Sequence, residues 1–424
     1  MNDKEKKKKP KYNEFQTTGW MISLAWKHDK SVLGFALLIP AIAVALNLVQ
    51  LFIAPTVLGK VEALAPLEEL LGTILFFSVA LFLLLGLQAF TQARDQVGPI
   101  VVRTKIIELI NRKMCMTSYP NLMDTKFKEV MAESRQATNS NWAPSEHIWR
   151  TLSDILQNVA GFVMYLVLLS HLEPVLLAVV LVTSLISFFI TNWTAGWDTR
   201  HKEEREKLSN RIYYIERVSK SQKTAKDIRI FGLAAWLMDI YEKTMTLYEN
   251  LWLRRAKVLF LGNLADVVFA FARNGIAYFY LIRMTLAGGL SAAEFLLYFS
   301  AFSGFSGWII GILKQFNTLH TESQSISVIR EFLDWPEPFR FEGGAPLPDL
   351  SGGCELTLEN VSYRYPEAKE DTIKNISLTL HPVEKVAVVG LNGAGKTTLV
   401  KLFCGLLDPT QGRVLLNGTD VREF

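Results

Sequence analysis

Cysteine is scarce in this sequence, with three residues among 424, namely Cys115, Cys354 and Cys404. None of the three has a close Cys or His neighbour at metal-ligand spacing, which argues against a cysteine-ligated metal and predicts reduced cytosolic thiols. A large net positive charge is also missing, because 45 Lys and Arg stand against 41 Asp and Glu. Nucleic acid is therefore disfavoured as a partner. The first apolar run begins near Ser31, is long and lacks a small-residue cleavage site, which argues against a removable signal peptide.

Charge is nearly absent from several stretches of about 20 residues, the length needed to cross roughly 30 Å of hydrocarbon. These stretches predict six transmembrane helices, at 32–56, 67–90, 153–171, 174–195, 258–283 and 291–313. Residues 335–424, by contrast, have the pattern of a soluble α/β segment. The sequence therefore predicts an α-helical membrane protein with a soluble tail.

The distribution of Lys and Arg predicts the orientation of the spans. The connections around 91–150 and 198–257 are rich in both residues, whereas the loop at 57–66 carries only Lys60 and the turn at 171–174 carries neither. Because basic loops stay inside, both termini are predicted to be cytoplasmic. A basic cluster ahead of the first span is interpreted as an anchor for anionic lipid or a topology signal; it consists of Lys4, Lys6, Lys7, Lys8, Lys9 and Lys11.

The two long inner connections lack the Gly, Pro and Ser density of flexible linkers. Runs such as 102–113 and 202–217 mix charged and apolar residues at helical spacing, which predicts that the membrane helices continue into the cytoplasm. Each connection contains a break that suits a short reversing helix, at 117–124 and 219–227. These helices are either contact points for a soluble motor or solvated surfaces without a partner.

The soluble tail contains a phosphate-binding motif. Residues 385–404 follow the order buried strand, glycine loop, helix, with the strand predicted over 385–389. Gly390–Thr397 reads GLNGAGKT and fits G-x-x-x-x-G-K-[ST] in full. Upstream, Tyr363 and Tyr365 fall on one side of a strand-like segment, where either ring could belong to the core or stack on adenine.

Each residue of the motif has a physical role in holding phosphate. Gly390, Gly393 and Gly395 let backbone N–H groups close around phosphate oxygens, and the following helix adds the positive end of its dipole. Lys396 is predicted to reach the β and γ phosphates of a nucleotide, and the Thr397 hydroxyl to ligate Mg²⁺.

The sequence resembles an ATP-binding cassette (ABC) exporter of the half-transporter type. The resemblance is carried by Tyr365, the phosphate loop and the GRVLLNG run at Gly412–Gly418, which follow the six predicted spans. The resemblance covers nearly the whole chain and implies ATP and Mg²⁺ as cofactors, Tyr365 as the adenine-stacking ring, and coupling helices near Tyr119 and Lys223. One departure is Val383, where the family commonly has Gly. The implied nucleotide-binding residues are Tyr365, Gly390, Asn392, Gly393, Ala394, Gly395, Lys396, Thr397 and Thr398, with Thr397 also on the metal.

The resemblance predicts four segments: a basic cytoplasmic segment at 1–30, a six-helix transmembrane domain at 31–333, a linker at 334–353 and a partial P-loop nucleotide-binding domain at 354–424. Leu350–Gly353 reads LSGG, but it precedes the phosphate loop and is interpreted as the last turn of the linker. The family's signature helix, acidic Mg²⁺ pair and switch histidine would follow Phe424, so no catalytic residue is predicted in the sequence. A longer protein is favoured over a naturally truncated one.

Charges within the spans are costly and usually functional. Asp266 and Arg273 share a face of the fifth predicted span. They either form a polar cavity wall that meets an anionic or polar group of the substrate, or they make structural pairs, with each other or with polar groups such as Asn47, Gln50 and Asn158.

The leading hypothesis is an ATP-driven exporter subunit in a bacterial plasma membrane, paired with a second half-transporter of the same or another kind. It would move an amphipathic peptide, lipid or drug-like molecule out of the cytoplasm by alternating access. The alternative is a truncated, nucleotide-binding but non-hydrolysing membrane subunit that pairs with or modulates an intact partner. A third, weaker option is a channel-like use of the same scaffold with ATP as regulator.

Overall fold

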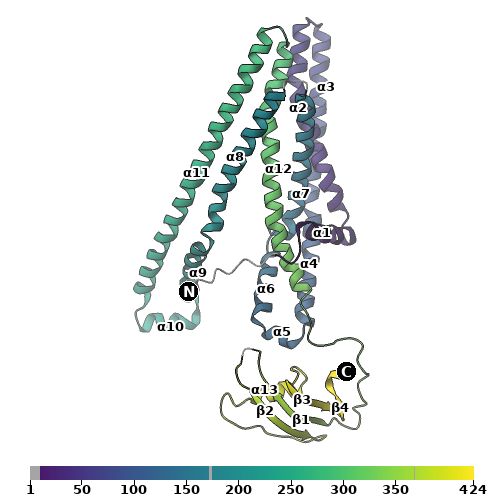
Figure 1. Cartoon of the computed structure of the whole chain (residues 1–424), viewed down its shortest axis with the longest axis vertical. Helices are drawn as coiled ribbons and strands as arrows, with labels where there is room; N and C mark the ends of the chain where they lie inside the picture. The colour runs from purple at the N-terminus through teal and green to yellow at the C-terminus, as the bar shows by residue number, and fades with distance from the viewer. Residues whose placement is uncertain (1–9, 171–173, 367) are drawn as a thin grey trace. The chain divides into compact units, whose positions relative to one another are not determined.

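The computed structural model describes residues 10–170, 174–366 and 368–424 (Figure 1). Its helices are α1 Glu14–His28, α2 Ser31–Glu62, α3 Leu67–Asp95, α4 Val97–Met116, α5 Tyr119–Met123, α6 Thr125–Gln136, α7 Pro144–Leu169, α8 Pro174–Arg200, α9 Lys202–Lys220, α10 Gln222–Ile230, α11 Ala234–Leu286, α12 Ala292–Leu333 and α13 Lys396–Phe403. Its strands are β1 Leu356–Tyr363, β2 Ile373–Leu380, β3 Gln411–Leu416 and β4 Thr419–Asp420, and a 3-10 turn covers Val421–Glu423.

The chain forms two compact units. The tail unit comprises the described residues of Met1–Asp29, Gly98–His147 and Thr321–Phe424, and the span unit comprises Lys30–Val97 and Ile148–His320. The first inner connection and the end of α12 therefore belong to the same unit as the soluble tail.

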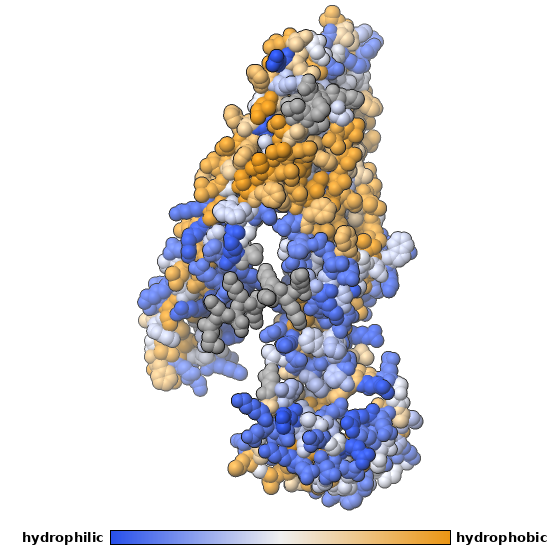
Figure 2. Space-filling model, viewed as in Figure 1, coloured by the Kyte–Doolittle hydropathy of each residue, from blue (hydrophilic) through white to orange (hydrophobic). Residues whose placement is uncertain are grey.

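The span unit has the six helices that the apolar windows predict: α2, α3, α7, α8, α11 and α12. Four described segments are long and apolar enough to cross a membrane, at Ser31–Glu62, Leu67–Met116, Pro144–Leu169 and Ala292–Leu333, and Ala178–Thr194 adds a shorter apolar stretch. Hydrophobic side chains cover much of the surface of this unit (Figure 2), as on α3, where Phe82 is 77% exposed. Such a surface is stable only against lipid or another apolar partner, and the predicted fold class is confirmed.

Close packing in the span unit depends on glycine. At Gly161 in α7 an added Cβ would lie 2.6 Å from the Trp308 ring of α12, and at Gly311 in α12 it would overlap the Asn158 amide of α7. Small residues let two helices approach where hydrophobic exclusion gives little driving force. Tyr165 on the same helix donates a hydrogen bond of 2.8 Å to the Asn47 side chain of α2.

Both predicted reversing helices are confirmed, as α5 and α10 (Figure 1). In the span unit α10 joins α9 to α11, and α11 packs along α8 and α9. The helix α1 was not predicted, although Asn13 and Gln16 form a capping box at its start, a signal that is readable in sequence. Residues 1–9, with most of the basic cluster, and the 171–173 part of the predicted turn lie outside the described residues.

The soluble tail has an antiparallel sheet in the order β2-β1-β3-β4. Its core is formed by side chains of the sheet, of α13 and of the turn after it: Leu358, Val361, Tyr363, Ile373, Leu399, Leu402, Leu407 and Val414. The LSGG segment forms a turn in which the Gly353 N–H donates to the Leu350 carbonyl at 3.0 Å, as the turn prediction requires.

The predicted buried strand at 385–389 is wrong. These residues form no strand, and Val389 is 88% exposed. An apolar run of this kind is typical of a strand with parallel neighbours on both sides, and no such neighbour lies beside it among the described residues. A strand without a partner leaves its N–H and C=O groups unpaired, so the segment stays irregular.

Candidate functional site

The phosphate loop takes a conformation that requires glycine. Gly393 has φ +86° and Gly395 has φ +88°, in the left-handed region that side chains with a Cβ rarely adopt. A Cβ on Gly395 would also lie 2.9 Å from Ile373 and 3.0 Å from the Thr372 carbonyl oxygen. Gly395 caps α13, so the chain turns sharply and aims the first N–H groups of the helix into the loop.

Lys396 folds back over this loop. Its Nζ donates hydrogen bonds of 2.8 Å and 2.7 Å to the carbonyl oxygens of Gly390 and Leu391. These two bonds hold the ammonium group against the first two residues of the loop. Asn392, in the same loop, is exposed.

The residues fit a nucleotide phosphate with Mg²⁺. Thr397 lies in the first turn of α13 and is exposed, while Thr398 is buried against the core. Among the described residues no group of three or more His, Cys, Asp or Glu side chains could hold a metal by itself. A Mg²⁺ ion here would take the Thr397 hydroxyl, phosphate oxygens and water, which is the usual way this ion is held with nucleotides.

The two tyrosines upstream of the loop lie in different environments. Tyr363 is 8% exposed and belongs to the core, and its burial raises the pKa of its phenol. Tyr365 is half-buried, its hydroxyl lies 3.1 Å from the Thr398 hydroxyl, and its ring meets Tyr363 edge-on at 4.9 Å. The ring predicted to stack on adenine is therefore fixed beside the helix that begins at Lys396.

The helix α5 contacts the same domain. Tyr119 and Met123 pack against the core of the sheet, and Lys401 Nζ of α13 lies 5.1 Å from the centre of the Tyr119 ring. A hydrogen bond with Tyr119 raises the pKa of Lys401. Sequence reasoning singled out the segment near Tyr119 but missed Lys401, because the two residues meet only after the chain folds.

Asp266 and Arg273 lie on α11 in the span unit. Asp266 accepts a hydrogen bond from the Ser187 hydroxyl of α8. Arg273 is 5% exposed, and its Nε and Nη1 have no hydrogen-bond partner among the described residues. Of the polar groups that the sequence offered as partners, Asn158 donates instead to the Asp154 carbonyl within its own helix.

The chain is similar to a known protein family and to several transport proteins. The family model described as "ABC transporter" matches residues 373–423. The subtilin transport ATP-binding protein SpaT of Bacillus subtilis is 25% identical over 231 residues, which cover 54% of this chain and 36% of that protein. An ATP-dependent lipid A-core flippase of Methylobacillus flagellatus is 27% identical over 270 residues, covering 63% of this chain and 43% of that protein.

A mitochondrial iron-sulfur clusters transporter of Candida glabrata is 27% identical over 252 residues, covering 57% of this chain and 33% of that protein. The solved structure of a bacterial Atm1-family ABC exporter with ATP bound is similar in fold, with a TM-score of 0.71 at 16% identity over 93% of this chain and 68% of that one. The chain spans less than half the length of these curated relatives, and the relatives differ in what they carry.

Proposed function

We propose, from the premise that this chain belongs to the ATP-binding cassette exporters, that it is a subunit of an ATP-driven transporter that moves an amphipathic molecule out of the cytoplasm. The observation that carries the proposal is the contact of Tyr119 in α5 with α13, the helix that begins at Lys396. A change at the nucleotide site can thereby reach a short helix in the first inner connection, which α4 joins to the span α3.

The residues of the loop would bind ATP. The N–H groups between Gly390 and Lys396 would surround the phosphates, and Lys396 would exchange its two carbonyl partners for phosphate oxygens, which are stronger acceptors for an ammonium. Thr397 would hold Mg²⁺ and Tyr365 the adenine ring. Hydrolysis needs groups that position and activate water, and the described residues supply no such group next to Thr397.

The transport path is proposed to lie within the span unit, with Asp266 and Arg273 on its wall. A buried guanidinium whose Nε and Nη1 have no acceptor among the described residues is costly in a membrane, and an anionic group on the cargo would satisfy it. We propose that two half-transporters, alike or unlike, pair around this path in a plasma membrane. The basic inner connections support cytoplasmic termini.

The first experiment is ATP binding by the purified full-length protein, compared with Lys396→Ala. We expect the variant to bind ATP at least about 10-fold more weakly, because it loses a charge-assisted contact to phosphate. In sealed vesicles the same variant should abolish ATP-dependent uptake of a fluorescent amphipathic cation or anion. Equal ATP affinity in the two proteins would contradict the proposal.

The second candidate is a nucleotide-binding subunit that does not hydrolyse ATP. It is favoured by one observation: Lys396 bonds only to main-chain carbonyls, and no described carboxylate makes a hydrogen bond or ion pair with Lys396 or Thr397. Mg²⁺-dependent ATPase activity separates the two functions. Turnover by the purified protein without another subunit, abolished in Lys396→Ala, would exclude the second candidate.

A further inference from the structure

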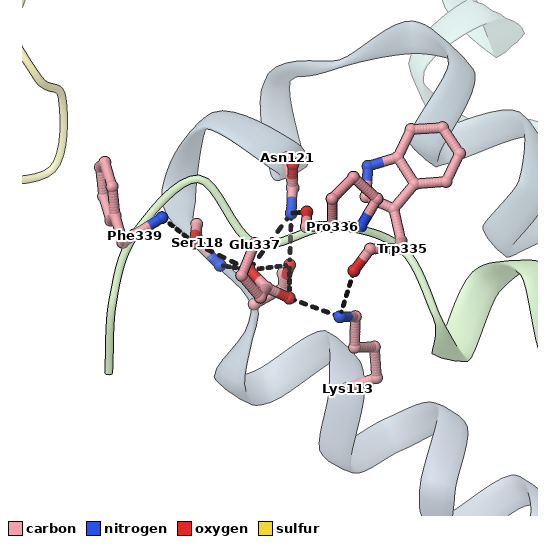
Figure 3. Close-up of polar contacts among 8 residues, drawn as sticks. Lys113, Ser118, Asn121, Trp335, Pro336, Glu337 and Phe339 are labelled. Atoms are coloured by element: carbon pink, nitrogen blue, oxygen red, sulfur yellow. Dashed lines mark hydrogen bonds and ion pairs between the residues drawn. The ribbon is translucent and has the colours of Figure 1, made fainter. Parts of the chain in front are cut away.

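One carboxylate fastens the linker after α12 to the turn before α5. Glu337 Oε2 accepts hydrogen bonds of 2.7 Å from both the backbone N–H and the hydroxyl of Ser118, and Oε1 accepts one of 3.0 Å from the Thr117 hydroxyl. Lys113 Nζ, at the end of α4, lies 2.6 Å from Oε1. In Figure 3 the Glu337 side chain points into this turn with its partners around it.

The main chain of the linker joins the same network (Figure 3). Lys113 Nζ donates to the Trp335 carbonyl at 2.7 Å, and the Asn121 amide donates to the Pro336 carbonyl at 3.0 Å and to Glu337 at 3.2 Å. The Phe339 N–H donates to the Ser118 hydroxyl at 3.3 Å. Four consecutive or nearly consecutive linker positions are thus tied to one short stretch of the first inner connection.

These polar groups are largely withdrawn from water. Ser118 is 1% exposed and Asn121 is 6% exposed. Buried donors that lose their acceptor cost more than an ordinary hydrogen bond contributes, so the network favours one geometry strongly. At the start of the linker, Trp335 also meets the buried Phe127 of α6 edge-on at 5.6 Å.

The helix α5 therefore has a different partner at each side. Its preceding turn and Asn121 hold the linker, while Tyr119 and Met123 pack against the core of the nucleotide-binding domain near Lys401. A helix of five residues is not stable alone, so these contacts determine where it lies.

We propose that Glu337 is a positioning residue that makes α5 and the linker move as one piece. A displacement of α13 on nucleotide binding then passes through Tyr119 to α5, and through Ser118 and Glu337 to the linker and the end of α12. The inference rests on the proposed function, since it needs nucleotide to bind at the phosphate loop. It assigns Glu337 a role that neither its sequence position nor the phosphate motif indicates.

The test is hydrogen exchange of the full-length protein in nanodiscs, read in peptides covering 113–124 and 335–341. In Glu337→Ala we expect exchange of the Ser118 and Phe339 amides to be about 10-fold or more faster, because both lose a partly buried acceptor network. Glu337→Gln keeps one acceptor oxygen and is expected to show a smaller increase. Glu342→Gln is the matched control, because Glu342 is exposed in the same linker and makes no hydrogen bond or ion pair to any residue that the structure describes.

The second measurement is the change in hydrogen exchange when ATP is added without Mg²⁺. In the wild type we expect ATP to change exchange at 390–398, at 118–123 and at 335–341. In Glu337→Ala the change at 390–398 should persist while the change at 335–341 is lost, which a residue with a merely structural role would not produce. Unaltered exchange in Glu337→Ala, or a linker response that persists in it, would overturn the inference. Absence of any response at 390–398 in the wild type would instead count against the proposed function.

Discussion

Gly395 carries two independent constraints. Its φ of +88° excludes most residues by backbone strain, and its approach to Ile373 and the Thr372 carbonyl leaves no room for a side chain. A motif match in sequence gives only the first of these reasons, since the second depends on β2 lying against the loop. The same residue therefore shapes the phosphate site and closes the packing between the loop and the sheet.

Gly395→Ala is expected to destabilise the soluble domain by about 1–3 kcal/mol and to weaken ATP binding, because the loop must shift to relieve the overlap. Gly352→Ala is the control, since Gly352 has an ordinary φ and no heavy atom within 4 Å of an added Cβ. Thermal unfolding of the two purified variants measures the difference. Similar melting temperatures would show that the strain is not present in solution.

Arg273 differs from Arg283, the other basic residue in the part of α11 that follows Lys257. Arg273 is buried, whereas Arg283 is exposed. Replacing a buried cation that has no full set of acceptors by an apolar side chain of similar length is often neutral or stabilising. The stability of the helices and the recognition of cargo can therefore be separated at this position.

Arg273→Met should leave the melting temperature unchanged or higher, and it should lower ATP-dependent transport of an anionic amphipathic molecule about 10-fold or more while sparing a cationic one. Arg283→Met serves as the control and should change neither quantity. Uptake into vesicles with two dyes of opposite charge measures the effect. Loss of both transport activities together would indicate a structural role for Arg273.

At the scale of elements, the first inner connection is held to the linker by a titratable group. Burial by itself raises the pKa of Glu337, but hydrogen bonds from Lys113, Ser118 and Thr117 outweigh it and hold the pKa below its ordinary value. A lowered pKa in the folded state means that the carboxylate stabilises the fold above the unfolded pKa, near 4.3, and that this contribution is lost as pH falls through the folded value.

The melting temperature of the wild type should exceed that of Glu337→Gln by a constant amount between about pH 5 and 7, and the gap should begin to narrow as the pH falls below about 4.3. The glutamine variant has no proton to gain, so it isolates this one group from the other carboxylates. Melting curves of both proteins across this range test the expectation. A gap that is independent of pH down to 3.5 would show that the carboxylate is not held in its charged form.

At the scale of the whole molecule, the proposal requires that α10 and the nucleotide-binding domain lie on the same side of a membrane. The basic inner connections predict that side to be the cytoplasm, and the short loop after α2 the opposite side. Ala225 lies in α10, and Glu62 is exposed at the end of α2. The two positions therefore report on opposite faces.

Two substitutions are made in a variant without Cys115, Cys354 and Cys404. The new thiol of Ala225→Cys should react with an impermeant maleimide only in inside-out vesicles, and that of Glu62→Cys only in intact cells. The three native cysteines are exposed and must be removed first. Labelling of both positions from the same side would contradict the predicted topology. Mass spectrometry of the labelled protein gives the readout.

The sequence by itself determined the features that depend on local pattern. Lack of charge over about 20 residues predicts a span wherever lipid is the solvent, and GLNGAGKT predicts the loop because its glycines and lysine have local roles. The breaks at 117–124 and 219–227 likewise predicted α5 and α10. These features need little information from distant residues.

Only the tertiary structure decided the features that join distant segments. The 385–389 run failed as a strand because a strand depends on neighbours that lie elsewhere in the chain. The alternating strand pattern did not separate Tyr363 from Tyr365, and packing places the first in the core and the second against α13. Glu337 meets Ser118 across 219 residues. Long-range contacts of this kind follow from how the helices pack, which no local pattern specifies.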